Sequence, residues 1–84
     1  MHPGEALVVP ERVIVAPAVG IFRTTNDAAI AGLFVDEGDH IGFVDGPGTA
    51  TPVRSPFRGE LVGMLAHPGE RLREGQPVAW LRVA

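Results

Sequence analysis

The residues best suited to chemistry in this chain form one acidic run that ends in a histidine, Asp36-Glu37-Gly38-Asp39-His40. Carboxylates and an imidazole are common ligands of Zn²⁺ and Ca²⁺. Consecutive residues of a strand and turn point in different directions, however, and no second cluster supplies matching ligands. Because acidic side chains are mostly exposed, the run predicts a solvated turn and no metal site. His67, which precedes Pro68 in a similar turn, is interpreted in the same way.

Hydroxyl groups gather near the middle of the chain, at Thr49, Thr51 and Ser55. Nothing in their spacing places a histidine base against a hydroxyl, and a nucleophilic triad is recognised by its geometry and not by sequence position. We therefore predict no catalytic residue. Arg54 and Arg58 lie close by and are candidates for binding a carboxylate or phosphate. The alternative is that these two arginines are edge-strand charges that prevent aggregation.

The chain contains no lysine, so all its basic side chains are arginines. Attachment of a cofactor through an amide or a Schiff base needs a side-chain amine, which a guanidinium does not replace. The absence of cysteine excludes disulfides and thiolate chemistry. We expect no covalent cofactor. The seven arginines are Arg12, Arg23, Arg54, Arg58, Arg71, Arg73 and Arg82.

The chain is 84 residues long and has a mild net charge of −3. This length predicts one small domain, and the charge pattern has no basic stripe of the kind that binds nucleic acid. No apolar run approaches the roughly 18 residues of a membrane span, and the first residues do not resemble a signal peptide. We expect a cytoplasmic protein. Eleven glycines and eight prolines favour short strands joined by turns over long helices.

Two segments of the chain look like copies of one another. Ala16-Pro17-Ala18-Val19-Gly20 is matched 39 positions later by Ser55-Pro56-Phe57-Arg58-Gly59. A second match pairs Gly38 with Gly69, 31 positions later, which implies eight extra residues in the first half and places them at 24–31. Two similar halves predict an all-β flattened barrel of two four-stranded antiparallel sheets related by a pseudo-twofold axis.

The strands of this barrel are predicted from short runs rich in valine and isoleucine. Residues 1–11 are expected to form an extended arm, and Asp45-Gly46-Pro47-Gly48 is expected to favour a turn over paired strands. The predicted strands are 12–16, 19–23, 32–35, 53–55, 60–65 and 77–83, with 40–44 short and extended and 71–72 following a turn. The predicted core consists of Ile14, Val19, Ile21, Phe34, Ile41, Leu61, Val62, Leu65, Leu72, Val78, Trp80 and Leu81.

These motifs resemble the biotinyl/lipoyl carrier domain. The turn Gly69-Glu70-Arg71-Leu72-Arg73-Glu74-Gly75-Gln76-Pro77-Val78 is similar to the second-half turn of that family. Pro17-Ala18-Val19-Gly20-Ile21-Phe22-Arg23-Thr24 is similar to the opening of the biotin carboxyl carrier protein of bacterial acetyl-CoA carboxylase. The resemblance implies a carrier fold over residues 12–84, with 24–31 in the place of that protein's protruding thumb.

The chain departs from this family at one place, the stretch Val44–Pro56 between the halves. The family has its modified lysine there, within Glu-Ala-Met-Lys-Met. This chain lacks that motif, and the hairpin is expected to be shorter by about six residues. The resemblance therefore implies a non-biotinylated relative that docks on biotin carboxylase or carboxyltransferase subunits of acetyl-CoA carboxylase, the enzyme of fatty acid biosynthesis, and regulates that complex.

Two other functions remain open from the sequence. The cleft beside the shortened hairpin could bind a small molecule or carry out a biosynthetic reaction. The candidate ligand or partner surface consists of Phe43, Asp45, Arg54, Arg58, Thr25 and Asn26. The third possibility is a module of an envelope adaptor or transport assembly, since such proteins also use lipoyl-like domains.

Overall fold

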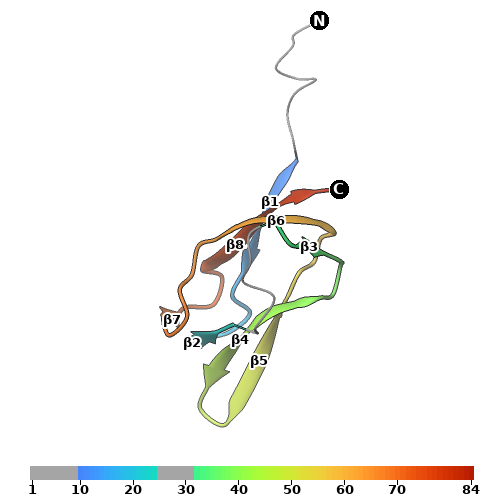
Figure 1. Cartoon of the computed structure of the whole chain (residues 1–84). Coiled ribbons are helices and arrows are strands. Elements are labelled where there is room, and N and C mark those ends of the chain that lie inside the picture. The colour runs from blue at the N-terminus through green and yellow to red at the C-terminus, as the bar shows by residue number, and fades with distance from the viewer. Residues whose placement is uncertain (1–9, 25–31) are drawn as a thin grey trace, which may run out of the picture.

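The computed structural model of the chain describes residues 10–24 and 32–84. These residues form strands and turns and no helix, as Figure 1 shows, so the all-β prediction is confirmed. The strands are β1 (Glu11–Val15), β2 (Gly20–Arg23), β3 (Phe34–Val35), β4 (His40–Gly46), β5 (Thr49–Arg54), β6 (Gly59–Met64), β7 (Arg71–Leu72) and β8 (Pro77–Val83).

The strands make two four-stranded antiparallel sheets (Figure 1). Sheet A has the order β1-β8-β6-β3, and sheet B has the order β5-β4-β2-β7. Exchanging β1, β2, β3 and β4 for β5, β6, β7 and β8 converts one order into the other. The molecule therefore has the predicted pseudo-twofold symmetry, in which each sheet contains strands from both halves of the chain.

Hydrogen bonds show which turns of the two halves are equivalent. The amide of Gly38 donates to the carbonyl of Ser55 at 2.7 Å, and the amide of Gly75 donates to the carbonyl of Ala16 at 2.8 Å. Ala16 and Ser55 are the equivalent corner residues, 39 positions apart. Gly38 therefore corresponds to Gly75, 37 positions later, and the match of Gly38 with Gly69 was wrong.

Gly69 has a different counterpart. Its amide donates to the carbonyl of Phe22, and the amide of Gly32 makes the same bond to the carbonyl of Leu61, both at 2.7 Å. The segment from Phe22 to Gly32 in the first half is therefore two residues longer than the equivalent segment from Leu61 to Gly69, and not eight residues longer. The sequence misled because Gly38 and Gly69 are both followed by an acidic residue. The thumb at 24–31 lies outside the described residues except for Thr24, and it stays a prediction.

The core lies between the two sheets. Six of the predicted core residues are fully buried: Ile14, Ile41, Leu61, Leu72, Val78 and Leu81. Ile21, Val62 and Trp80 are only half-buried. The prediction was wrong for Val19, Phe34 and Leu65, which are 53%, 50% and 47% exposed. It also missed several residues that fill the interior: Ala16, Phe22, Val35, Val44, Val53, Ala66 and Ala79.

Bulges in the strands explain part of this difference. The pairing of β4 with β5 shifts between His40 and Gly42, so the neighbours Ile41 and Gly42 are both buried. The pairing of β1 with β8 shifts at the equivalent place, and Val78 and Ala79 are both buried there. A bulge inserts one extra residue and so reverses the alternation of faces beyond it. Strict alternation along the sequence does not predict this change.

β4 and β5 form a hairpin that remains paired to its tip. Asp45 pairs with Ala50 and Gly46 with Thr49, so the expectation of an unpaired loop from Asp45 to Gly48 was wrong. Only Pro47 and Gly48 form the turn. A proline at its first central position and a positive φ of 71° at Gly48 fit a type II turn. In Figure 1 the hairpin tip lies at the end of the domain opposite the C-terminus.

Candidate functional site

The tip of the β4–β5 hairpin is the place where the resembled family has its modified lysine. In this chain Pro47 and Gly48 occupy the tip, and neither side chain contains an amine. No lysine is present elsewhere in the 84 residues to take over this role. The residues present therefore do not fit an amide-linked biotin or lipoyl group, although the hairpin that would present it is fully formed.

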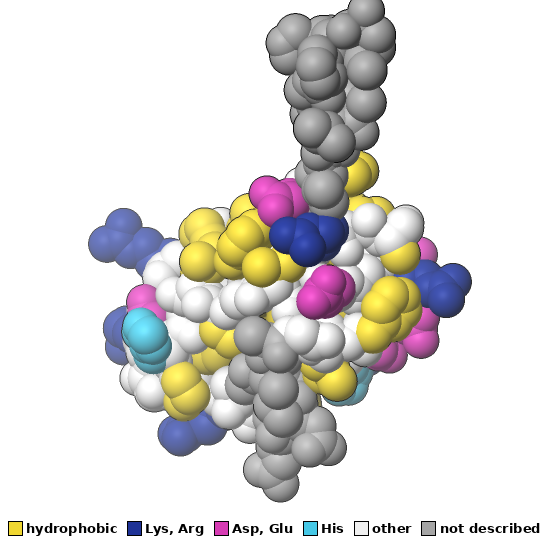
Figure 2. All heavy atoms as spheres, turned by 45° about the horizontal axis from the view of Figure 1, so that its top comes forward, with side chains coloured by type: hydrophobic (Ala, Val, Ile, Leu, Met, Phe, Trp, Pro, Cys, Tyr) yellow, Lys and Arg dark blue, Asp and Glu magenta, His cyan; other side chains and the backbone are white. Residues whose placement is uncertain are grey.

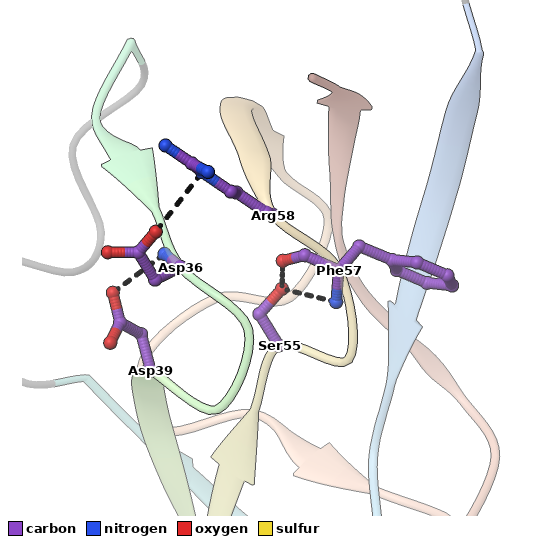
Figure 3. Close-up of polar contacts among 5 residues, drawn as sticks. All are labelled: Asp36, Asp39, Ser55, Phe57 and Arg58. Atoms are coloured by element: carbon purple, nitrogen blue, oxygen red, sulfur yellow. Dashed lines mark hydrogen bonds and ion pairs between the residues drawn. The ribbon is translucent and has the colours of Figure 1, made fainter.

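The corner after β5 is held by a buried serine (Figure 3). The Ser55 hydroxyl donates to the carbonyl of Phe57 at 2.6 Å and accepts from the amide of Phe57 at 3.2 Å. Only 1% of Ser55 is exposed. Both hydrogen-bonding directions of the hydroxyl are thus used by the backbone. Ser55 stabilises the corner, and among the described residues no side-chain base is hydrogen-bonded to its hydroxyl.

The acidic run forms the predicted turn. Gly38 has a positive φ of 92°, and the amide of Asp36 donates to a carboxylate oxygen of Asp39 at 2.8 Å (Figure 3). Among the described residues, no group of three or more histidine, cysteine or acidic side chains has the arrangement of a metal site. The Asp39 carboxylate has a structural use here, because it closes the turn before β4.

Arg58 and Arg54, the two predicted anion-binding residues, both contact the turn of the acidic run. Arg58 makes an ion pair with Asp36 at 3.3 Å (Figure 3), and its guanidinium lies 5.4 Å from the ring centre of Phe34. Arg54 donates to the carbonyl of Gly38 at 3.3 Å. Both arginines therefore have a partner in this turn, Arg58 through a carboxylate and Arg54, from β5, through a backbone carbonyl.

The outer face of sheet B has a shallow hollow of about 270 Å³, lined by Arg23, Phe43, Asp45 and Ala50. Phe43 and Asp45 belong to the predicted surface and are brought together there. Arg54 is not among the lining residues. Arg23, which the sequence analysis missed, makes an ion pair with Asp45 at 3.4 Å. Arg23 could be identified only from the pairing of β2 with β4, which places it opposite Phe43, and the sequence alone does not give that register.

Thr25 and Asn26, the remaining residues of the predicted surface, lie outside the described residues. A second hollow of about 280 Å³ lies on the outer face of sheet A, between β1 and β8. Its floor includes Trp80, which corresponds to Phe43 of sheet B under the pseudo-twofold. Its lining consists of Glu11, Arg12, Val13, Leu65 and Trp80.

Charged side chains of both signs are interspersed with hydrophobic ones on the face shown in Figure 2. The ion pairs of the described residues join exposed side chains, and such pairs contribute about 0–1 kcal/mol each. The described part of the chain has no helix with the length and hydropathy of a membrane span. In the described part of the chain, the arrangement offers a shallow hollow with an aromatic side chain on the outer face of each sheet.

No protein-family model matches the sequence, and no curated protein matches it. Solved structures do match. The whole chain superposes on 8% of a single-chain, multi-domain long-chain acyl-CoA carboxylase with a TM-score of 0.78 and 18% identity. Another match is Kluyveromyces lactis urea carboxylase, with a TM-score of 0.75 and 20% identity over 86% of this chain and 6% of the carboxylase.

The fold is not confined to carboxylases. The succinylglutamate desuccinylase/aspartoacylase from Rhodobacter sphaeroides matches 82% of this chain and 21% of its own length, with a TM-score of 0.63 and 25% identity. This chain thus spans only 6–8% of the two carboxylases and about a fifth of the third protein. The comparisons show that the chain has the fold of a small segment found in two carboxylases and in an acylase-type protein.

Proposed function

We propose that this chain is a carrier-fold protein that holds no biotin and docks on a biotin carboxylase or carboxyltransferase subunit of an acyl-CoA carboxylase. The observation that carries the proposal is the β4–β5 hairpin. It is paired from His40–Arg54 to Gly46–Thr49, yet its tip is Pro47-Gly48 where the resembled family has a lysine. The docking scaffold is retained while the attachment chemistry is absent. The similarity to segments of two carboxylases supports this type of partner.

Such a protein would act by occupying the carrier's place. A domain with the carrier fold and no transferable group lowers carboxylase turnover if it competes with the biotinylated carrier for the same surface. Because it offers no reacting atom, its effect is competitive binding, and excess biotinylated carrier relieves it.

The first test measures modification. The chain is co-expressed with a biotin ligase, and its intact mass is compared with that of a variant in which Glu-Ala-Met-Lys-Met replaces Pro47-Gly48. We expect added biotin mass on the grafted variant, which shows that the ligase is active, and none on the native chain. Added biotin mass on the native chain would overturn the proposal.

The second test measures docking. Purified biotin carboxylase and carboxyltransferase subunits are passed over the immobilised chain in a biolayer interferometry experiment, with an unrelated β-sandwich domain as the reference. We expect saturable binding to one subunit and a lower turnover of the reconstituted carboxylase. Absence of binding to every subunit tested would sink the docking role.

A second candidate function is small-molecule binding at the sheet B hollow. The favouring observation is the meeting of an ion pair, Arg23 with Asp45, and an aromatic ring, Phe43, around about 270 Å³. The presence of the fold in an acylase-type protein shows that its use is not restricted to carboxylases. An NMR screen of small aromatic carboxylates distinguishes this function, since saturable shifts at β2 and β4 without carboxylase binding would favour it.

A further inference from the structure

The outer face of sheet B presents three rows of side chains. Strand pairing places Arg71, Ile21, Asp45 and Ala50 in one row that crosses all four strands. The next row consists of Arg23, Phe43 and Pro52, and the third of His40 and Arg54. The alternating residues Phe22, Val44 and Val53 are buried on the core side. These rows therefore form one continuous outward surface.

The charge of this face is unbalanced. It contains three arginines, Arg23, Arg54 and Arg71, and a single carboxylate, Asp45, on a chain whose net charge is −3. Arg23 makes the ion pair with Asp45 at 3.4 Å. Within residues 10–24 and 32–84, neither Arg54 nor Arg71 has a carboxylate within 4.0 Å. Arg54 uses one N–H on the carbonyl of Gly38 at 3.3 Å, so its other N–H donors and the guanidinium of Arg71 are paired with no carboxylate of these described residues.

The equivalent face of sheet A is different. Its central Arg82 lies between two carboxylates, at 4.0 Å from Glu11 and 3.9 Å from Glu60. Arg82 corresponds to Asp45 under the pseudo-twofold, so the side chain at the centre of the row is positively charged in sheet A and negatively charged in sheet B. This row of sheet A has one positive and two negative side chains, whereas the outer face of sheet B, over its three rows, has an excess of two positive charges. The asymmetry identifies sheet B as the face with an electrostatic preference for an acidic partner.

The hollow beside these arginines adds an apolar contact. Phe43 and Ala50 contribute apolar surface, and the rim is formed by Arg23 and Asp45. The His40 ring meets Phe43 edge-on, with 5.9 Å between the ring centres, and extends the apolar surface toward Arg54. A space of about 270 Å³ is suited to one apolar side chain rather than a large ligand.

The edge of sheet B is unsuited to the addition of a strand. β5 is the edge strand nearest the hollow, and it contains Pro52, which has no amide hydrogen to donate to a new neighbour. β7, the other edge, has only two residues. A partner therefore contacts the face of the sheet and not its edge.

We propose that the outer face of sheet B is a docking site for an acidic protein segment, with carboxylates on Arg54 and Arg71 and an apolar side chain between them in the Phe43 hollow. The identification of that segment with a carboxylase subunit rests on the proposed function, whereas the chemistry of the site rests on sheet B alone. Guanidinium groups bind carboxylates through paired N–H donors, which gives the contact direction as well as attraction.

The test uses a defined probe, the capped peptide Glu-Glu-Phe-Glu-Glu, titrated into isotope-labelled protein and followed by amide NMR shifts. We expect saturable shifts on β2, β4, β5 and β7, and binding that weakens as salt is raised. The double variant Arg54→Glu/Arg71→Glu is expected to weaken binding at least about tenfold, as expected for reversing charges at a complementary interface. The matched control, Arg12→Glu/Arg58→Glu, changes net charge equally but leaves sheet B intact and keeps the affinity.

Several results would overturn the site. Equal shifts with Gln-Gln-Phe-Gln-Gln, shifts centred on sheet A, or equal losses in both double variants would each do so. Self-association that disappears in Arg54→Glu/Arg71→Glu would assign the face to a second copy. The proposed carboxylase role can fail while the site stands. If the chain binds the acidic peptide but no carboxylase subunit, the site is retained and the carboxylase role is rejected. Subunit binding that is unchanged in Arg54→Glu/Arg71→Glu keeps the role and rejects the site.

Discussion

Gly20 and Gly59 occupy equivalent corners of the two halves, and each lies against the backbone of a neighbouring strand. A Cβ atom at Gly20 would stand 2.6 Å from the carbonyl oxygen of Asp45, and a Cβ at Gly59 would overlap the carbonyl oxygen of Arg82. Asp45 and Arg82 are themselves equivalent in β4 and β8. The repeated Pro-x-x-Gly motif is thus explained by a close backbone approach that only glycine permits.

Gly59→Ala is predicted to destabilise the fold by about 2–3 kcal/mol, since the obstructing atoms are backbone and cannot rotate away. Gly38→Ala provides the comparison, because no atom lies within 4 Å of its added Cβ and only the positive φ of 92° opposes it. That conformational term is about 1 kcal/mol. Urea unfolding of both variants measures the difference, and equal losses would contradict the steric explanation.

Ser55→Ala is predicted to cost about 1–2 kcal/mol, because the amide and carbonyl of Phe57 lose their partner in a partly buried corner. Thermal and urea unfolding measure this loss. Thr49→Ala, at an exposed hairpin position, is the control and is expected to change stability by less than about 0.5 kcal/mol. The equivalent residue of the first half is a buried alanine, Ala16, so a neutral Ser55→Ala would show that neither corner needs the hydroxyl.

Asp39 and Gln76 are predicted to have the same role in equivalent turns. The amide of Asp36 donates to Asp39 at 2.8 Å, and the amide of Arg73 donates to the Gln76 side chain at 3.0 Å. Asp39→Ala is expected to lower stability by about 0.5–1 kcal/mol in chemical unfolding, because this side-chain acceptor closes the turn. Asp39→Asn keeps an acceptor oxygen and should retain most of the stability. Identical losses in the two variants would reject this role.

Gln76→Ala is predicted to cost somewhat more than Asp39→Ala, about 1–1.5 kcal/mol, because Gln76 also donates to the Glu70 carboxylate at 3.1 Å. Glu70 in turn accepts from the amide of His67 at 2.9 Å, so one substitution affects two successive turns. Hydrogen exchange by NMR should show faster exchange at His67 as well as at Arg73. Faster exchange confined to Arg73 would show that the two turns are independent.

Gly48→Ala is predicted to loosen the hairpin tip, since its φ of 71° is unfavourable for an L-residue with a Cβ. We expect about 1 kcal/mol of destabilisation and faster hydrogen exchange at Gly46 and Thr49, with little change in the core. Thr51→Ser, farther down β5, serves as a control for the strand itself. Unchanged exchange at the tip in Gly48→Ala would contradict the type II turn.

The sequence predicted the fold class and most of the strands, because short apolar runs between glycine and proline turns are local signals. β8 was predicted with the bounds that the structure has, Pro77–Val83. The 39-residue repeat of the Pro-x-x-Gly corners also followed from sequence, as did the absence of any lysine. These features depend on residue type and spacing alone.

Other features depended on register, which only the folded structure defines. Bulges at equivalent places in β4 and β8 changed which residues face the core. The true partner of Gly38 became clear from its hydrogen bond to Ser55. Arg23 lies beside Asp45 because β2 pairs with β4 across 22 residues of sequence. The sequence alone determined that the hairpin tip has no lysine for cofactor attachment. Strand pairing in the folded structure decided which charged side chains share the outer face of sheet B, because a shift of one residue in a strand exchanges its two faces.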